Sequence, residues 1–335
     1  MRVVVTGATG HVGSNLVRAL IERGDQVRVL VRGRETALAG LELERVAGDV
    51  RDADSLRRAF AGAEIVYHLA AMISISGDPY GHVRAVNVDG TRRVAEAALA
   101  CGARRMVHCS SVHAFDLYQR GGGGETIDEQ WPRVPDAASH FAYDRSKAAG
   151  ERALREVMAR GLEAVIVHPS GAIGPFDFGP SRMGRVLLGL YHRSLPSLLA
   201  GSFDFVDVRD VVGGMIAAGE RGRAGENYIL AGDVLSLQAL ARLAHEVTGV
   251  RPPRLRAPMW LAHVGVPFVE AAGRILRQEP LYTRESLAVL ASRGRFSWAK
   301  AGRDLGYAPR PMSETVRDTY AWFEQAGMLA RARRA

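Results

Sequence analysis

The segment FAYDRSKAAGER, residues 141–152, contains two side chains that together could move a proton. Tyr143 and Lys147 are four residues apart, so on a helix they share one face, about 6 Å apart along the axis. A phenol alone has a pKa of about 10 and is a poor acid–base catalyst at neutral pH. An ammonium group beside it stabilises the phenolate, and the pair is then suited to proton transfer near neutral pH.

Lys147 also differs from nearly every other cationic residue of the chain. The sequence contains 44 Lys and Arg residues, and only Lys147 and Lys300 are lysines. A compact ammonium with rotatable donors fits a narrow space in which a rigid planar guanidinium is badly shaped. We therefore interpret the lysine at position 147 as a requirement of its site.

The segment VHCSSVHAF, residues 107–115, adds hydroxyl groups that could polarise a carbonyl oxygen. It follows a predicted strand, and the carboxyl ends of parallel strands are where chemistry takes place in such sheets. Ser111 is the preferred candidate, with Ser110 behind it. A turn or a helix cap is the alternative interpretation of this serine pair.

Short apolar strands alternate with helices over the first half of the chain, which predicts an α/β fold with a doubly wound parallel sheet buried on both faces. Strands are expected at 2–7, 26–32, 43–49, 63–70, 105–111 and 163–169, and helices at 14–24, 53–62, 90–102 and from about Tyr143. From about residue 175 the alternation breaks down. We expect a large domain of residues 1–174 with a return segment at about 203–230, and a smaller second domain of residues 175–202 and 231–335.

The segment TGATGHVGSN, residues 6–15, places three glycines between the first strand and the first helix. Gly7 permits the tight turn, Gly10 lets the backbone approach a pyrophosphate, and Gly13 lets the helix pack closely on the strand. The spacing is GxxGxxG rather than GxGxxG. This context predicts a Rossmann-type dinucleotide site in the large domain, and the smaller C-terminal domain is then expected to bind the substrate.

The end of the second strand indicates which dinucleotide is bound. NAD favours a carboxylate there, for the ribose 2′-hydroxyl, whereas the 2′-phosphate of NADP favours arginine. This chain has Arg32 at the strand end and Arg34 two residues on, while Asp25 precedes the strand and cannot serve. NADP(H) is therefore preferred, with NAD(H) as the alternative. Asp49 is placed to accept a hydrogen bond from the adenine amino group.

Eight short motifs, in this order and spacing, resemble the extended short-chain dehydrogenase/reductase superfamily, specifically its NAD-dependent epimerase/dehydratase group. They are TGATGHVG, GDVRD, YHLAA, NVDGT, CSSVHAF, YDRSK, HPSGAIGP and FVDVRDV. The match covers nearly the whole chain and is most specific at YxxxK. In detail the sequence most resembles the dihydroflavonol-reductase-like branch.

The resemblance implies roles for individual residues. Tyr143 would be the catalytic acid–base, Lys147 its partner, and Ser111 the polarising hydroxyl, while Asn87 would be a structural or supporting residue. Lys147 would also hydrogen-bond the nicotinamide ribose. The residues expected to bind the cofactor are Gly7, Thr9, Gly10, His11, Val12, Gly13, Arg32, Arg34, Asp49, Val50, Leu69, Ala70, Ala71, Ser110, Tyr143, Lys147, His168, Pro169 and Ser170.

Two departures from the family pattern narrow the range of possible substrates. Nucleotide-sugar members usually have Asn where this chain has Gly171, and an arginine ahead of the FVDVRDV segment where this chain has Phe203. We therefore predict an NADP(H)-dependent oxidoreductase that reduces a small, fairly apolar ketone or aldehyde, or oxidises the alcohol. A nucleotide-sugar epimerase or dehydratase is the first alternative, and a non-catalytic NADP-binding regulator is the second.

The distribution of charge, apolar segments and cysteines argues against several other classes of protein. The formal net charge is +8, but the arginines are spread along the chain, so nucleic acid is not an expected partner. The apolar segment 257–276 is interrupted by prolines and charges, so it is expected to be packed helix or a lining for an apolar substrate rather than a membrane span. Two cysteines without CxxC spacing, and no recognisable signal peptide, predict a cytoplasmic protein. We expect no metal site, and a homodimer.

Overall fold

The computed structural model describes residues 1–33, 35–74, 77–117, 125–137, 140–257, 266, 287–288 and 295–330. The expected cofactor residue Arg34 and most of the apolar segment 257–276 lie outside these ranges. No helix in the described ranges is long and apolar enough to cross a membrane. No group of three or more His, Cys, Asp and Glu side chains in them is placed to hold a metal ion.

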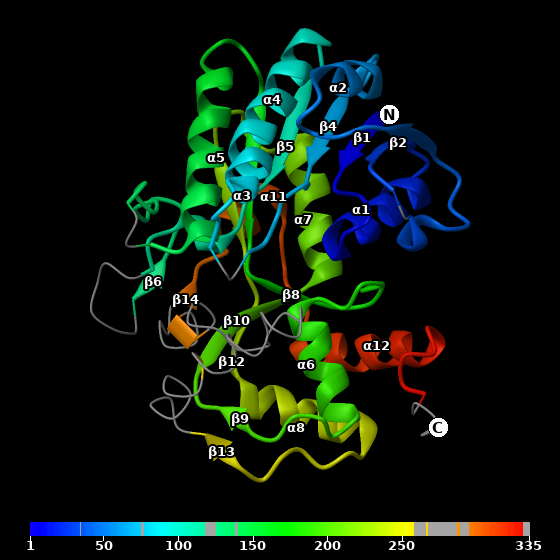
Figure 1. Cartoon of the computed structure of the whole chain (residues 1–335), viewed down its shortest axis with the longest axis vertical. Helices are drawn as coiled ribbons and strands as arrows, with labels where there is room; N and C mark the ends of the chain where they lie inside the picture. Colours follow the sequence, from blue (N-terminus) through cyan, green and yellow to red (C-terminus); the bar gives the residue numbers. More distant parts are fainter. Residues whose placement is uncertain are drawn as a thin grey trace.

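A seven-stranded sheet forms the centre of the molecule, and all of its strand pairs are parallel (Figure 1). The strand order is β11-β7-β5-β4-β1-β2-β3. The order reverses between β1 and β4, and such a switch point opens a crevice at the carboxyl ends of the strands. The strands are β1 (Arg2–Thr6), β2 (Gln26–Val31), β3 (Glu44–Ala47), β4 (Ile65–His68), β5 (Arg105–Cys109), β7 (Ala164–Pro169) and β11 (Asn227–Leu230).

Helices cover both faces of this sheet. On one face α1 (His11–Glu22) packs against α7 (Val208–Arg221), which in turn contacts α11 (Ala299–Leu305). On the other face α4 (Thr91–Ala100) packs between α2 (Ala53–Phe60) and α5 (Ala142–Met158) (Figure 1). Two separate apolar cores result, one on each face, and β-branched residues of the strands contribute to both. The predicted doubly wound α/β class is confirmed.

The helix expected at 90–102 is longer than its apolar pattern indicated. It is preceded without a break by α3 (His82–Arg84) and by the π-helical turn η2 (Ala85–Gly90). π-Helical turns such as η2 are rare and often occur at functional sites.

Short 3-10 helices η1 (Thr36–Leu38) and η3 (Val112–Ala114) follow the ends of β2 and β5.

A smaller sheet lies below the large one in the view of Figure 1. It consists of β8 (Gly171–Ile173), β10 (Ser202–Asp207) and β12 (Asp233–Ser236), with β10 in the middle. An apolar core joins it to α6 (Arg182–Tyr191), α8 (Leu237–Thr248) and α12 (Met312–Gln325). The remaining two-stranded pairs are β9 (Leu198–Leu199) with β13 (Arg256–Ala257), and β6 (Thr126–Ile127) with β14 (Arg295–Phe296).

The chain crosses between the two sheets more than once. The return segment at 203–230 starts in the small sheet as β10 and then supplies α7 and β11 to the large one. Ala301, Leu305 and Tyr307, which the sequence analysis grouped with the second domain, pack in a core of the large sheet. The domain boundaries therefore remain a proposal.

Candidate active site

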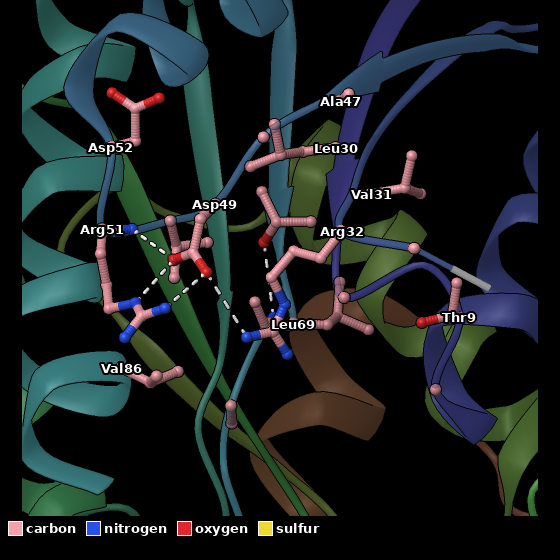
Figure 2. Close-up of a pocket in the computed structure, with 18 residues that line it drawn as sticks. Thr9, Leu30, Val31, Arg32, Ala47, Asp49, Arg51, Asp52, Leu69 and Val86 are labelled. Carbon is pink, nitrogen blue, oxygen red and sulfur yellow. Dashed lines mark hydrogen bonds and ion pairs between the residues drawn. The ribbon is translucent and has the colours of Figure 1, made fainter. Parts of the chain in front are cut away.

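A cavity of about 920 Å³ opens at the carboxyl ends of β1, β2 and β3, next to the end of β4 (Figure 2). Its position is the crevice predicted by the strand order, and its volume lies in the range of cofactor sites. The lining residues are Thr6, Gly7, Thr9, Gly10, Leu30, Val31, Arg32, Gly33, Ala47, Gly48, Asp49, Val50, Arg51, Asp52, Leu69, Ala70, Ala71 and Val86. Of the residues expected to bind the cofactor, Gly7, Thr9, Gly10, Arg32, Asp49, Val50, Leu69, Ala70 and Ala71 line this cavity, whereas His11, Val12, Gly13, Ser110, Tyr143, Lys147, His168, Pro169 and Ser170 do not.

The glycine segment forms a cradle that larger residues would fill. Gly7 has a positive φ of 74°, and a Cβ there would lie 2.5 Å from the amide nitrogen of Ala70. A Cβ on Gly13 would lie 2.2 Å from the carbonyl oxygen of Gly7, so glycine lets α1 pack closely on the turn. The N-cap residue Gly10 has no side chain with which to cap α1. The first N–H groups of α1 can therefore bind an anion such as a pyrophosphate.

The side chain of His11 has a different role from the glycines beside it. Its Nε2 lies 3.2 Å from the carbonyl oxygen of Gly174 and 3.1 Å from that of Pro175. Asn15 Nδ2 donates a hydrogen bond to the same Pro175 oxygen, at 3.0 Å. His11 therefore joins the start of α1 to the segment that follows β8, and a contact from His11 to a cofactor would come from its backbone.

Three charged residues meet at one end of the cavity. Arg51 donates from Nε and Nη2 to the two carboxylate oxygens of Asp49, at 2.9 and 3.0 Å, and Arg32 Nη1 lies 3.5 Å from the same carboxylate (Figure 2). The hydrogen bonds from Arg51 and the charges of both arginines outweigh burial, and they lower the pKa of Asp49 to about 2. Asp49 is thus ionised and oriented, with lone pairs left to accept from an adenine amino group. Arg51 belongs to the GDVRD motif, but the motif by itself did not predict a role for its side chain.

Tyr143 and Lys147 lie one turn apart near the start of α5, and both are buried. Lys147 Nζ donates a hydrogen bond to the carbonyl oxygen of Cys109 at the end of β5, at 2.9 Å. Burial lowers the pKa of Lys147, while Cys109 and the Glu151 carboxylate act in the opposite direction. A buried lysine with a perturbed pKa beside a phenol is typical of a catalytic site.

Ser111 forms the helix cap that was the alternative interpretation of the serine pair. Its Oγ accepts a hydrogen bond from the backbone N–H of His113 at 3.2 Å, and it thereby caps η3. Accepting this bond leaves the hydroxyl proton available as a donor. Since η3 packs against α5, the cap places Ser111 beside the helix that carries Tyr143 and Lys147.

Asn87 has the supporting role implied by the resemblance. From the π-helical turn η2 its amide pairs with both backbone groups of Met72, at 2.7 and 2.9 Å, and donates to Ser146 Oγ at 2.9 Å. Gly150 of α5 lets the Asn87 carbonyl approach closely, because a Cβ at Gly150 would lie 2.5 Å from that oxygen. Asn87 thus ties the segment after β4 to α5, the helix that carries Tyr143 and Lys147.

His113 and Asp144 form a pair that the sequence analysis did not predict. His113 Nδ1 lies 2.9 Å from Asp144 Oδ1, and Asp144 is buried on α5 next to Tyr143. The His113 ring meets the Tyr143 ring edge-on, with centroids 5.5 Å apart, and lies 6.2 Å from the ring of Phe203. Spacing could not have revealed the pair, because 31 residues separate its members.

The two departures from the nucleotide-sugar pattern turn out to be in contact. A Cβ on Gly171 would lie 3.0 Å from the Phe203 ring and 3.1 Å from the carbonyl oxygen of Asp204. The Phe203 ring therefore occupies the space that an asparagine side chain at position 171 would need. The Phe203 ring also lies 6.2 Å from the ring of His113, which in turn meets Tyr143.

Pro169 and Ser170, expected to bind the cofactor, lie at the end of β7 and just after it, but the side chain of His168 is completely buried. Its Nδ1 lies 3.2 Å from the backbone oxygen of Ser111, and burial lowers the pKa of His168 to about 4. A contact from His168 to the cofactor would therefore come from its backbone.

The doubly wound sheet, the glycine cradle and the buried Tyr–Lys pair define a dinucleotide-dependent oxidoreductase. Comparison with known proteins agrees: the NAD dependent epimerase/dehydratase family matches residues 3–231. The chain belongs to this family and is an NAD(P)-dependent oxidoreductase of the extended short-chain dehydrogenase/reductase type.

Individual relatives match over nearly their whole length. Sterol demethylase protein B of Methylococcus capsulatus is 36% identical over 98% of this chain and 100% of its own. A putative dihydroflavonol 4-reductase of Synechocystis is 32% identical over 97% of this chain and 95% of its own. The crystal structure of gox2253, 36% identical, superimposes with a TM-score of 0.83 over 97% of this chain and 98% of the other.

Proposed function

We propose that this protein is an NADP(H)-dependent oxidoreductase that reduces a ketone or aldehyde of a small, fairly apolar substrate, or oxidises the corresponding alcohol. The observation that carries the proposal is the buried pair of Tyr143 and Lys147 on α5, with the ring of His113 between the Tyr143 ring and the Phe203 ring. The phenol and the ammonium supply acid–base chemistry, and the ring packed on Gly171 supplies an apolar contact in place of polar sugar-binding groups.

Each residue of the proposed catalytic set has a distinct task. When bound, the nicotinamide ring supplies or accepts the hydride. Ser111 donates a hydrogen bond to the carbonyl oxygen of the substrate, and Tyr143 gives a proton to that oxygen as the alcohol forms. Lys147 stabilises the phenolate that remains, since its charge lies on the same face of α5. In alcohol oxidation the proton moves in the reverse direction.

The apolar character of the substrate is supported by two findings. Phe203 belongs partly to the apolar core beneath the small sheet and partly to the cluster around Phe115, so its ring is held in place. The names of two relatives also support an apolar substrate, because one refers to a sterol and the other to a dihydroflavonol. We infer that the substrate presents a carbonyl or hydroxyl group on a largely apolar skeleton.

Substrate selection distinguishes this proposal from the nucleotide-sugar alternative. With NADPH present, apolar cyclic ketones and aromatic aldehydes are expected to be reduced, as measured by the loss of nicotinamide absorbance. UDP-sugars are expected to be neither epimerised nor dehydrated, because Phe203 and Gly171 replace the polar groups. Turnover of a UDP-sugar without turnover of any apolar carbonyl would reverse this conclusion.

The proposed preference for NADP(H) depends on Arg32. Arg32 is exposed and lines the cavity, and its contact with Asp49 is long, at 3.5 Å, which supports a guanidinium that is free to pair with a 2′-phosphate. Arg32→Asp is expected to weaken NADPH binding by roughly 10- to 100-fold, because this is the loss in affinity that follows removal of a hydrogen bond to a charged group. The same substitution is expected to make NADH the preferred cofactor. Fluorescence titration of both cofactors measures the change.

Arg58→Asp is the matched control for this variant. It makes the same charge change at an exposed position of α2 outside the cavity lining. The order of cofactor affinities should be unaffected in this control. Equal affinity of the unmodified protein for NADPH and NADH would refute the proposed preference.

A further inference from the structure

A buried carboxylate lies directly behind the candidate catalytic serine. Glu151 is on α5, one turn after Lys147, and only 1% of it is exposed. Its Oε1 accepts a hydrogen bond of 2.5 Å from Ser110 Oγ, and its Oε2 accepts one of 2.9 Å from Arg133 Nε. Burial alone would raise the pKa of Glu151, but the charge of Arg133 and these hydrogen bonds act in the opposite direction, and the pKa is lowered below the usual value. Glu151 is therefore ionised.

Arg133 connects this carboxylate to the segment 125–137. Its Nη2 donates to Asn227 Oδ1 at 2.9 Å, and its Nη1 donates to the backbone oxygen of Trp131 at 2.8 Å. The guanidinium also stacks over the ring of Phe115, 4.1 Å from the centroid. Arg133 thus uses its full planar fork, which a lysine could not replace.

His168 closes the network on the side of Ser111. Its Nδ1 lies 3.2 Å from the Ser111 backbone oxygen and 3.4 Å from Glu151 Oε1, and both of these atoms are acceptors. The neutral ring therefore carries its proton on Nδ1 and donates toward them. The ring also packs against Phe115, with centroids 4.7 Å apart. The side chain of Ser110 and the backbone oxygen of Ser111 are consequently held by groups that converge on Glu151.

We propose that Glu151 is a positioning residue for Ser111. It acts through Ser110 and His168, and with Arg133 it couples the serine turn to the segment 125–137. The proposal rests on the proposed function, in which Ser111 polarises the substrate carbonyl. A buried ion pair is costly to desolvate and is often no more stabilising than a well-packed apolar pair, so stability alone does not account for it. Ser110, His168 and Glu151 lie where β5, β7 and α5 meet, next to Ser111. These three residues can therefore fix the orientation of the Ser111 hydroxyl.

A double-mutant cycle between Glu151 and Ser111 tests this role. Glu151→Gln keeps the shape of the side chain and removes its charge. It is expected to lower kcat by roughly 10- to 100-fold, the scale for a displaced catalytic group, with KM and the Kd for NADPH unchanged. In the Ser111→Ala background the same substitution should have almost no further effect on kcat, because the group that Glu151 orients is gone. A purely structural role would lower kcat by the same factor in both backgrounds.

Glu156→Gln is the matched control, since Glu156 lies on the same helix but is exposed and pairs with Arg92 at the surface. It should change kcat by less than about twofold. If Glu151→Gln does not fold, Ser110→Ala replaces it, because it removes one hydrogen bond to Glu151 and leaves the ion pair intact.

Three results would overturn the positioning role: wild-type kcat in Glu151→Gln, wild-type kcat in Ser110→Ala, or equal losses in both backgrounds. Failure of the proposed function has a different signature. Ser111→Ala and Tyr143→Phe would then both retain full turnover, whatever the Glu151 variants do.

Discussion

Tyr143→Phe is expected to lower kcat by roughly 10²- to 10⁴-fold, the loss that follows removal of a positioned acid–base group. The substitution keeps the buried ring and its edge-on contact with His113 and removes only the hydroxyl. Binding of NADPH should therefore remain close to that of the unmodified protein. Steady-state turnover of an apolar ketone and a separate NADPH titration measure the two quantities.

Tyr320→Phe is a control with the same chemical change. The Tyr320 hydroxyl donates to the backbone oxygen of Leu187 in the core of the small sheet, at 2.8 Å. Its loss should cost about 1 kcal/mol of stability and leave kcat unchanged. Full turnover by Tyr143→Phe would remove the catalytic assignment, and a non-catalytic NADP-binding regulator would then become the leading proposal.

Lys147→Arg is expected to impair both turnover and NADPH affinity, with kcat lower by roughly 10²-fold. The ammonium is buried and bonded to the Cys109 carbonyl, so a larger planar guanidinium cannot take the same place without moving α5 or β5. The loss in affinity follows because the proposed bond from Lys147 to the nicotinamide ribose is made by the same ammonium. Kinetics and cofactor titration on one preparation separate the two effects.

The other lysine provides the control. Lys300 Nζ bonds to Glu226 and to the backbone oxygen of Asn227 at the start of β11, and it remains partly exposed. Lys300→Arg should therefore leave kcat and NADPH affinity unchanged. Unchanged kinetics in Lys147→Arg would show that the site tolerates a guanidinium and that the lysine has no special role there.

Much of the fold could be predicted because its signals are local. Buried parallel strands require short apolar, β-branched runs, and the turn at Gly7 requires a positive φ that glycine readily adopts. Tyr143 and Lys147 were predictable for the same reason, since a spacing of four places two side chains on one helical face. The pairing of Arg51 with Asp49 also had a local signal, because the two residues are only two positions apart. The backbone N–H of Arg51 bonds to the same Asp49 carboxylate.

The sequence by itself determined the doubly wound class, the dinucleotide cradle and the Tyr–Lys pair, all of which depend on residues close together in the chain. Only the tertiary structure decided which distant residues support them. Glu151 meets Ser110 across 41 residues, His168 meets Ser111 across 57, and Arg133 meets Asn227 across 94. The physical reason is that these contacts follow from the order of β5, β7 and β11 in the sheet and from the packing of α5 on them. Spacing along the chain carries no information about that order, so the buried carboxylate bonded to Ser110 becomes visible only in the folded molecule.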